Sequence, residues 1–210
     1  MNNYQIFFAI LGAVLYLIGF VPYVYHIFHG RVVPHAFSWS VWAILWGINT
    51  YILIGSEWWS LSIVSPVVRS VALVIGSIIA WFYISRVHIS RLDIIAIVLA
   101  GICLIVAYIY GAHSAIIPTI LVDILVLIPT LRKIHDNPDS EDAFAWILVV
   151  FSQAATLLSL PTHTLENSLF WAYVMVMNWL VAIYILMRRR TVQSWSYKIT
   201  HIYKKYILRN

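Results

Sequence analysis

Charged residues, cysteine and glycine are all scarce in this sequence. Of its 210 residues, 10% are charged and 62% are hydrophobic, and the mean hydropathy is +0.88. A water-soluble domain usually carries about 25% charged residues and cannot cover so much apolar surface. The shortage of charge therefore excludes a soluble globular protein.

The single cysteine, Cys103, excludes a disulfide framework, a CxxC redox pair and a thiolate-rich metal site. No glycine-rich loop of the kind that holds phosphate is present, and no nucleophile and base stand out with a third group to orient them. The last apolar run contains no lysine, which excludes a retinal Schiff base. We therefore expect no enzymatic activity, no cofactor and no resident metal.

Seven apolar stretches fill almost the whole chain. A helix needs about 20 apolar residues to cross a hydrocarbon layer about 30 Å thick. The stretches are 4–28, 36–54, 58–84, 94–110, 115–131, 144–160 and 169–187. They predict an all-α integral membrane protein with seven transmembrane helices. No positive charge precedes the first stretch, so we expect it to be a retained helix and not a signal peptide.

Basic residues fall on one side of this predicted topology. Every lysine and arginine except Arg69 lies in the first, third or fifth loop or in the tail after Met187. Loops rich in lysine and arginine stay in the cytoplasm. The sequence thus predicts an external N-terminus and a cytoplasmic C-terminus, in the plasma (inner) membrane.

The two halves of the chain share a weak internal repeat. Placing Pro22 on Pro129 also places Phe-Ser-Trp at 37–39 on Phe-Ala-Trp at 144–146 without a gap. Stretches one to three and five to seven then have the same orientation, with the fourth stretch between them. The predicted layout is therefore three plus one plus three helices in parallel repeats, divided into a first three-helix bundle (1–86), a linker helix (87–112), a second bundle (113–187) and a tail (188–210).

With this layout, the chain resembles the PQ-loop and SWEET superfamily of solute transporters. The residues that carry the resemblance are Gly19-Phe20-Val21-Pro22 and Pro129, together with the aromatic triplets at 37–39 and 144–146. The glutamine that follows the family's proline is Tyr23 in one half and Thr130 in the other. This departure from the amino-acid-exporting branch favours a divergent branch. In the sugar-transporting members, asparagines at mid-depth on the third and seventh helices hold the substrate. Asn178 matches one of them, and Ser77 stands at the other position.

Two charged residues interrupt the predicted spans. Arg69 and Asp123 each lie about 15 Å from the outer surface, near the middle of the bilayer. We expect them to be close to each other, either directly or through a water or the substrate. They could form a structural ion pair, bind a substrate or couple transport to protons, or each have a separate partner.

Other polar and aromatic residues lie at similar depth. Trp42, Trp46 and Asn49 share one face of the second helix, which suits a flat ligand or, alternatively, helix packing. Gln153 joins Trp46, Asn49, Arg69, Ser77, Asp123 and Asn178 in the predicted substrate-binding set. Pro22 and Pro129 are predicted hinges, or else fixed kinks.

Three histidines and the basic tail lie at the predicted cytoplasmic side. His26, His29 and His35 cluster at the predicted inner edge, where they could ligate a metal, sense pH or simply be solvated. From residue 194 onward the tail has an apolar and a basic face, which predicts a helix on the anionic inner leaflet or a disordered charged segment.

These features favour a transporter or facilitator of a small, ring-bearing organic solute that works by alternating access. The alternative is a membrane receptor or sorting protein of the same fold that binds a ligand without moving it. The expected partners are the lipid bilayer and a small-molecule substrate, with self-association left open and no role for nucleic acid.

Overall fold

The structure is a computed structural model that describes residues 2–57, 60–83, 91–110, 114 and 116–206. These residues form seven α-helices and two short 3₁₀ helices, η1 (Leu61–Ile63) and η3 (Pro138–Ser140), and no strand. The α-helices are α1 (Asn3–Phe28), α2 (Ala36–Glu57), α3 (Val64–Tyr83), α4 (Arg91–Tyr110), α5 (Ile116–Asp136), α6 (Ala143–Ser159) and α7 (Leu165–Tyr206).

The bundle is apolar outside, and its largely apolar interior also holds polar and charged side chains. Its exposed side chains include long apolar rows, such as Phe7, Ile10 and Val14 on α1 and Ile102 and Ile105 on α4. Its buried polar and charged side chains come from several helices: Ser38, Asn49, Thr50, Ser65, Arg69, Thr119, Asp123, Thr130, Ser152, Gln153 and Thr156. Exposed apolar surface and interior polar groups are typical of a protein surrounded by lipid.

Four segments of the described chain are long and apolar enough to cross a membrane. They are Asn3–Phe28, Ala36–Gly55, Leu61–Tyr83 and Ser168–Gln193. The apolar parts of α4 and α6, Ile94–Tyr110 and Ala143–Ser159, are shorter, and α5 carries a buried aspartate near its middle. The molecule is thus an all-α protein with several membrane-crossing helices.

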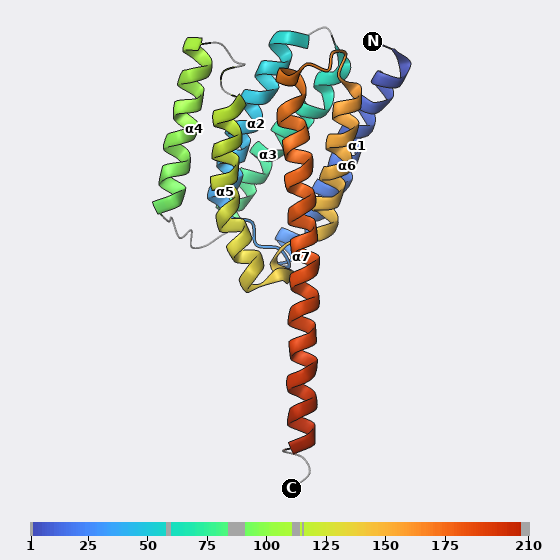
Figure 1. Cartoon of the computed structure of the whole chain (residues 1–210), viewed down its shortest axis with the longest axis vertical. Helices are drawn as coiled ribbons and strands as arrows, with labels where there is room; N and C mark the ends of the chain where they lie inside the picture. The colour runs from blue at the N-terminus through green and yellow to red at the C-terminus, as the bar shows by residue number, and fades with distance from the viewer. Residues whose placement is uncertain (1, 58–59, 84–90, 111–113, 115, 207–210) are drawn as a thin grey trace.

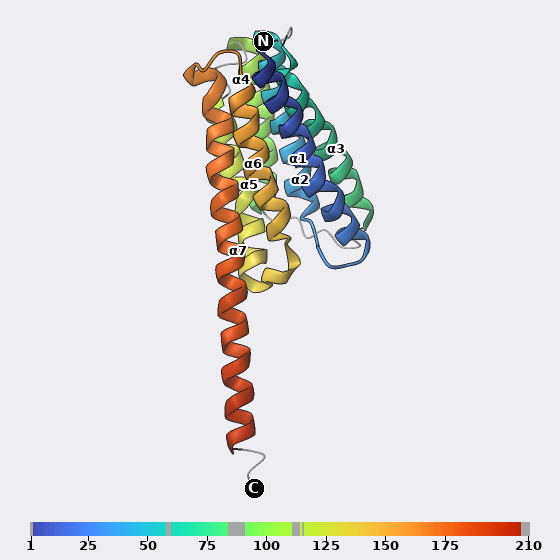
Figure 2. The same cartoon turned by 90° about the vertical axis from the view of Figure 1, so that its right-hand side faces the viewer.

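The helices lie side by side along the long axis of the molecule, with the N-terminus at one end of the bundle (Figures 1 and 2). α1 packs against α3 and α6, and α7 packs against α5 and α6. α2 packs against α3 and α5, and α4 lies at the edge against α2 and α5 (Figure 1). We call the end that holds the α1–α2 and α5–α6 connections the connection end.

Helix α7 continues far beyond the connection end. It runs unbroken through 42 residues, Leu165–Tyr206, and its last part projects from the bundle along the same axis (Figures 1 and 2). The part of the tail that the structure describes, as far as residue 206, is helical, as one of the two sequence-based alternatives requires. It does not turn to lie across the bundle end, as a helix on a membrane surface would. No glycine or proline follows Leu165 that could end or bend the helix.

Helices α2 and α3 touch closely at Gly76. A Cβ atom placed on Gly76 would lie 2.1 Å from Cζ3 of Trp39, whereas one on Gly47 would meet no atom within 4 Å. We expect Gly76→Ala to destabilise the protein by about 1–3 kcal/mol, because the indole of Trp39 would have to move. Thermal unfolding of the purified protein in detergent measures this effect, with Gly47→Ala as the matched control. Equal melting temperatures for the two variants would contradict the packing described.

Candidate functional site: a cavity between two groups of helices

A cavity of about 110 Å³ lies inside the bundle. At about 10–15 Å³ for each water, it has room for several water molecules or one small organic molecule. Six of the seven α-helices line it, and none of the described α4 residues does. The lining residues are mostly aromatic or aliphatic, with three polar exceptions: Arg69, Asp123 and Asn178.

Arg69, on α3, is the largest fully buried side chain of the described protein. Its guanidinium carbon lies 4.5 Å from the ring centre of Tyr16 and 4.4 Å from that of Trp46. Nη2 donates a hydrogen bond of 2.7 Å to Ser152 Oγ, which in turn donates to the Gly12 carbonyl. Nη1 is buried without a hydrogen-bond partner. Among the described residues, the positive charge is therefore held by aromatic faces and one hydroxyl, with no carboxylate in an ion pair.

Asp123, on α5, is the acidic residue of the cavity. It is buried, and its Oδ2 accepts a hydrogen bond of 2.7 Å from the Tyr173 hydroxyl on α7. No ion pair involves Asp123 within the described residues. The negative charge is thus held by a neutral donor, just as the positive charge of Arg69 is held by neutral groups.

The direct ion pair that the sequence allowed between Arg69 and Asp123 is absent from the described structure. Both residues instead line the same cavity. Of the three forms of proximity that we expected, contact through a water or a substrate remains a prediction. The alternative in which Arg69 and Asp123 form a structural ion pair between the two halves does not remain, because the described structure has no such pair.

The other sequence-predicted residues divide between the cavity and its surroundings. Trp46 and Asn178 line it, and so does Trp42. Asn49 and Ser77 do not: the amide of Asn49 donates to the Leu45 carbonyl, and Ser77 shares a hydrogen bond with Ser40.

Gln153 also lies outside the lining, fully buried, and neither atom of its amide has a hydrogen-bond partner. The prediction that it joins Arg69 and Asp123 around one substrate is therefore not supported by its position. Pro22 and Pro129 both lie within unbroken helices, α1 and α5. Their predicted role as hinges stays a prediction.

Five aromatic residues of the cavity were not among the residues predicted from the sequence to bind substrate: Tyr16, Phe20, Tyr23, Trp39 and Trp146. A signal for three of them was present. Trp39 and Trp146 are equivalent in the predicted internal repeat, and the same alignment places Tyr16 on Asp123. Equivalent positions of two repeats that face one another around an axis line the same central space.

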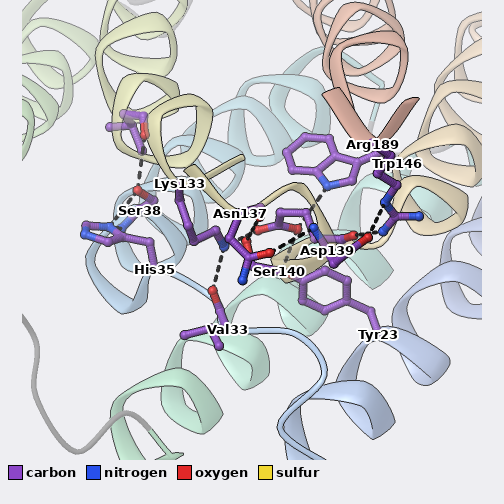
Figure 3. Close-up of polar contacts among 12 residues, drawn as sticks. Tyr23, Val33, His35, Ser38, Lys133, Asn137, Asp139, Ser140, Trp146 and Arg189 are labelled. Atoms are coloured by element: carbon purple, nitrogen blue, oxygen red, sulfur yellow. Dashed lines mark hydrogen bonds and ion pairs between the residues drawn. The ribbon is translucent and has the colours of Figure 1, made fainter. Parts of the chain in front are cut away.

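A second polar cluster lies at the connection end and centres on Glu141. Figure 3 labels its partners Tyr23, Lys133 and Trp146. The Glu141 side chain is 2% exposed. Its carboxylate accepts hydrogen bonds of 3.1 Å from the Tyr23 hydroxyl and from Trp146 Nε1, and it pairs with Lys133. Arg189 on α7 donates to the Glu141 carbonyl. One short segment thus connects α1, α5, α6 and α7.

The Glu141 cluster borders the cavity. Tyr23 and Trp146 line the cavity with their rings and bind Glu141 with their polar atoms. Lys133 also donates to the Val33 carbonyl, in the connection between α1 and α2 (Figure 3). Two aromatic residues of the cavity lining, Tyr23 and Trp146, are therefore fixed at the connection end by one buried carboxylate.

The predicted histidine cluster does not converge on one point. His26 pairs with Asp142 at 3.0 Å, His29 bonds the Tyr25 carbonyl and His35 bonds Ser38. The described residues contain no group of three or more histidine, cysteine or acidic side chains placed to hold a metal ion. The contact between His26 and Asp142 instead joins the end of α1 to the start of α6.

Comparison with known proteins adds no relative to this picture. Neither a scan of protein-family models nor searches of characterised proteins and of solved structures finds a match to this chain.

Proposed function

We propose that the chain is a membrane transporter for a small, ring-bearing organic solute, built from seven transmembrane helices in the three-plus-one-plus-three layout of the PQ-loop and SWEET superfamily. The observation that carries the proposal is the central cavity. It lies between α1, α2 and α3 on one side and α5, α6 and α7 on the other. Transporters made of two repeats bind their substrate at such an interface, near mid-membrane.

Helix packing supports the parallel repeat. Within each half, the third helix packs against the first and the second: α3 packs against α1 and α2, and α7 packs against α5 and α6. Between the halves, the first helix of each half packs against the second helix of the other: α1 packs against α6, and α5 packs against α2. A two-fold arrangement produces each contact twice. None of the described α4 residues lines the cavity, which suits a linker helix.

Alternating access requires that the cavity open to each side in turn. Towards the connection end, opening would separate Tyr23 and Trp146 from Glu141. Towards the other end, Trp46 packs against the buried Phe170 and Trp171, with ring centres 5.3 and 5.4 Å apart. These two layers are the barriers that transport would have to open.

Uptake by reconstituted vesicles tests the proposed function. We expect the protein to move at least one labelled ring-bearing solute, with sugars, nucleosides and vitamins in the first panel. Trp46→Ala should lower uptake strongly because it removes a cavity wall. Trp179→Ala, which removes an exposed indole of α7, is the matched control and should not. Binding of a solute without uptake would instead favour the receptor alternative.

The proposed topology has its own test. The side bearing the basic loops and the tail is proposed to be cytoplasmic, with the N-terminus outside. A reporter fused after Asn210 should be active in the cytoplasm, and one inserted at 111–114 should be active outside. Cytoplasmic activity of the second fusion would contradict the seven-helix count.

A further inference from the structure

Among the described residues, neither Arg69 nor Asp123 has a counter-ion in an ion pair. Arg69 is buried with neutral partners only, and Asp123 is buried against the Tyr173 hydroxyl. A buried charge without a partner of opposite sign is costly, and its cost falls when a ligand brings that partner. Here one cavity has a cation and an anion in its lining, and the two form no ion pair with each other.

A solute with one charge would satisfy only half of this site. A simple anion would pair with Arg69 but would be repelled by Asp123. A simple cation would pair with Asp123 but would be repelled by Arg69. A solute that carries both charges, separated by a short spacer, can face each residue with the opposite sign. Desolvated ion pairs that are correctly matched favour one partner strongly over wrongly charged ones.

The rest of the lining indicates a ring. Tyr16, Tyr23, Trp39, Trp42 and Trp146 all face the cavity. Flat aromatic walls give a ring a large contact area and a preferred orientation. Asn178 adds an amide whose Nδ2 already donates to the Val174 carbonyl, which leaves its oxygen as an acceptor for the solute.

From the unpaired Arg69 and Asp123 in one aromatic cavity, we propose that the substrate class is a ring-bearing zwitterion, with its anionic group at Arg69 and its cationic group near Asp123. This inference rests on the proposed function, because it takes the cavity as the substrate site. It goes beyond that function by naming the charges that the solute must carry.

Three compounds with the same ring test the charge requirement. Phenylalanine carries both charges, 3-phenylpropionate only the carboxylate, and 2-phenylethylamine only the ammonium group. Their dissociation constants are measured by calorimetry on the purified full-length protein. We expect phenylalanine to bind at least about tenfold more tightly than either singly charged compound, since each charge-assisted hydrogen bond contributes this much.

Variants of the two residues assign each charge. In Arg69→Gln, phenylalanine should lose its advantage over 2-phenylethylamine, and in Asp123→Asn it should lose its advantage over 3-phenylpropionate. The ranking of the three compounds on the unaltered protein stands as a test even where a variant does not fold. Equal or tighter binding of either singly charged compound to the unaltered protein overturns the proposal.

Failure of the inference and failure of the proposed function give different results. If none of the three compounds binds while vesicles still take up an uncharged solute, the zwitterion class is wrong and transport stands. If phenylalanine binds selectively but no solute is moved, the site is right and the protein is a receptor. If every compound binds equally weakly, the cavity does not recognise charge and the inference is overturned.

Discussion

Replacing Glu141 with alanine is expected to lower the free energy of unfolding by about 3–5 kcal/mol. Removing one partner of a buried ion pair has this cost because the other charge stays behind without compensation. Here the loss also leaves the buried Tyr23 hydroxyl and the Trp146 indole N–H without their acceptor. Three donors from α1, α5 and α6 would lose one common carboxylate.

Asp139 provides the matched control, two residues away in the same connection. Its carboxylate pairs with Arg189 at 3.1 Å, but its side chain is 79% exposed. Because solvent screens such a pair, Asp139→Ala should cost no more than about 1 kcal/mol. Chemical or thermal unfolding of both variants in detergent gives the comparison. Similar losses for the two would show that Glu141 is not the centre of the connection-end cluster.

Glu141→Gln distinguishes the effect of the negative charge from the effect of the side chain's shape. The amide oxygen can still accept hydrogen bonds from Tyr23 and Trp146, while the ion pair with Lys133 is lost. We expect a loss of stability between those of Glu141→Ala and Asp139→Ala. If these contacts also close the cavity during transport, the variant should shift the balance towards the state open at the connection end. Faster labelling of a cysteine introduced at Trp39 would report that shift.

The helices could be predicted because lipid imposes a simple rule. Every backbone polar group in the hydrocarbon layer must be bonded internally, so a long apolar run becomes a helix. The expected stretch 4–28 is α1 (Asn3–Phe28), and the expected stretch 36–54 lies within α2 (Ala36–Glu57). The stretch predicted at 58–84 has a 3₁₀ turn, Leu61–Ile63, before α3 starts at Val64. Residues 58, 59 and 84 lie outside the described structure.

The role of Glu141 could not be predicted in the same way. In the sequence it is one of four acidic residues in a polar connection, and nothing there separates it from the exposed Asp139. Its partner Tyr23 lies 118 residues away. Only the packing of α1 against α6 brings the two together, and helix rotation within a bundle is set by side-chain packing that apolar runs do not encode.

The same limit explains the result for Arg69 and Asp123. Position along a helix follows from counting residues, so the place of each residue within its helix could be predicted, and both side chains are buried. The direction in which each side chain points depends on how α3 and α5 are rotated. In the structure Arg69 is stacked between Tyr16 and Trp46, and these rings and Ser152 take the contacts that Asp123 would have made.

Arg69→Met is expected to lower the uptake rate at limiting substrate by at least about 30-fold, if the cavity binds its solute as proposed. Truncating one partner of a buried, charged hydrogen bond costs at least about 2 kcal/mol, which corresponds to this factor. Arg190→Met, in the exposed part of α7, is the control and should leave uptake unchanged.

Combining Arg69→Met with Asp123→Asn then distinguishes a structural pair from a shared substrate. Without solute the two residues share no partner, so their effects on the free energy of unfolding should add to within about 0.5 kcal/mol. For the free energy of solute binding, the second substitution should cost less in the double variant than it does as a single substitution. A zwitterion that no longer pairs with one residue is also not held in position against the other. Strong coupling in the solute-free protein would mean that the two charges stabilise each other directly, and the cavity would then be a structural feature. Additive unfolding energies together with coupled binding energies are the result that only a solute bridging the two residues produces.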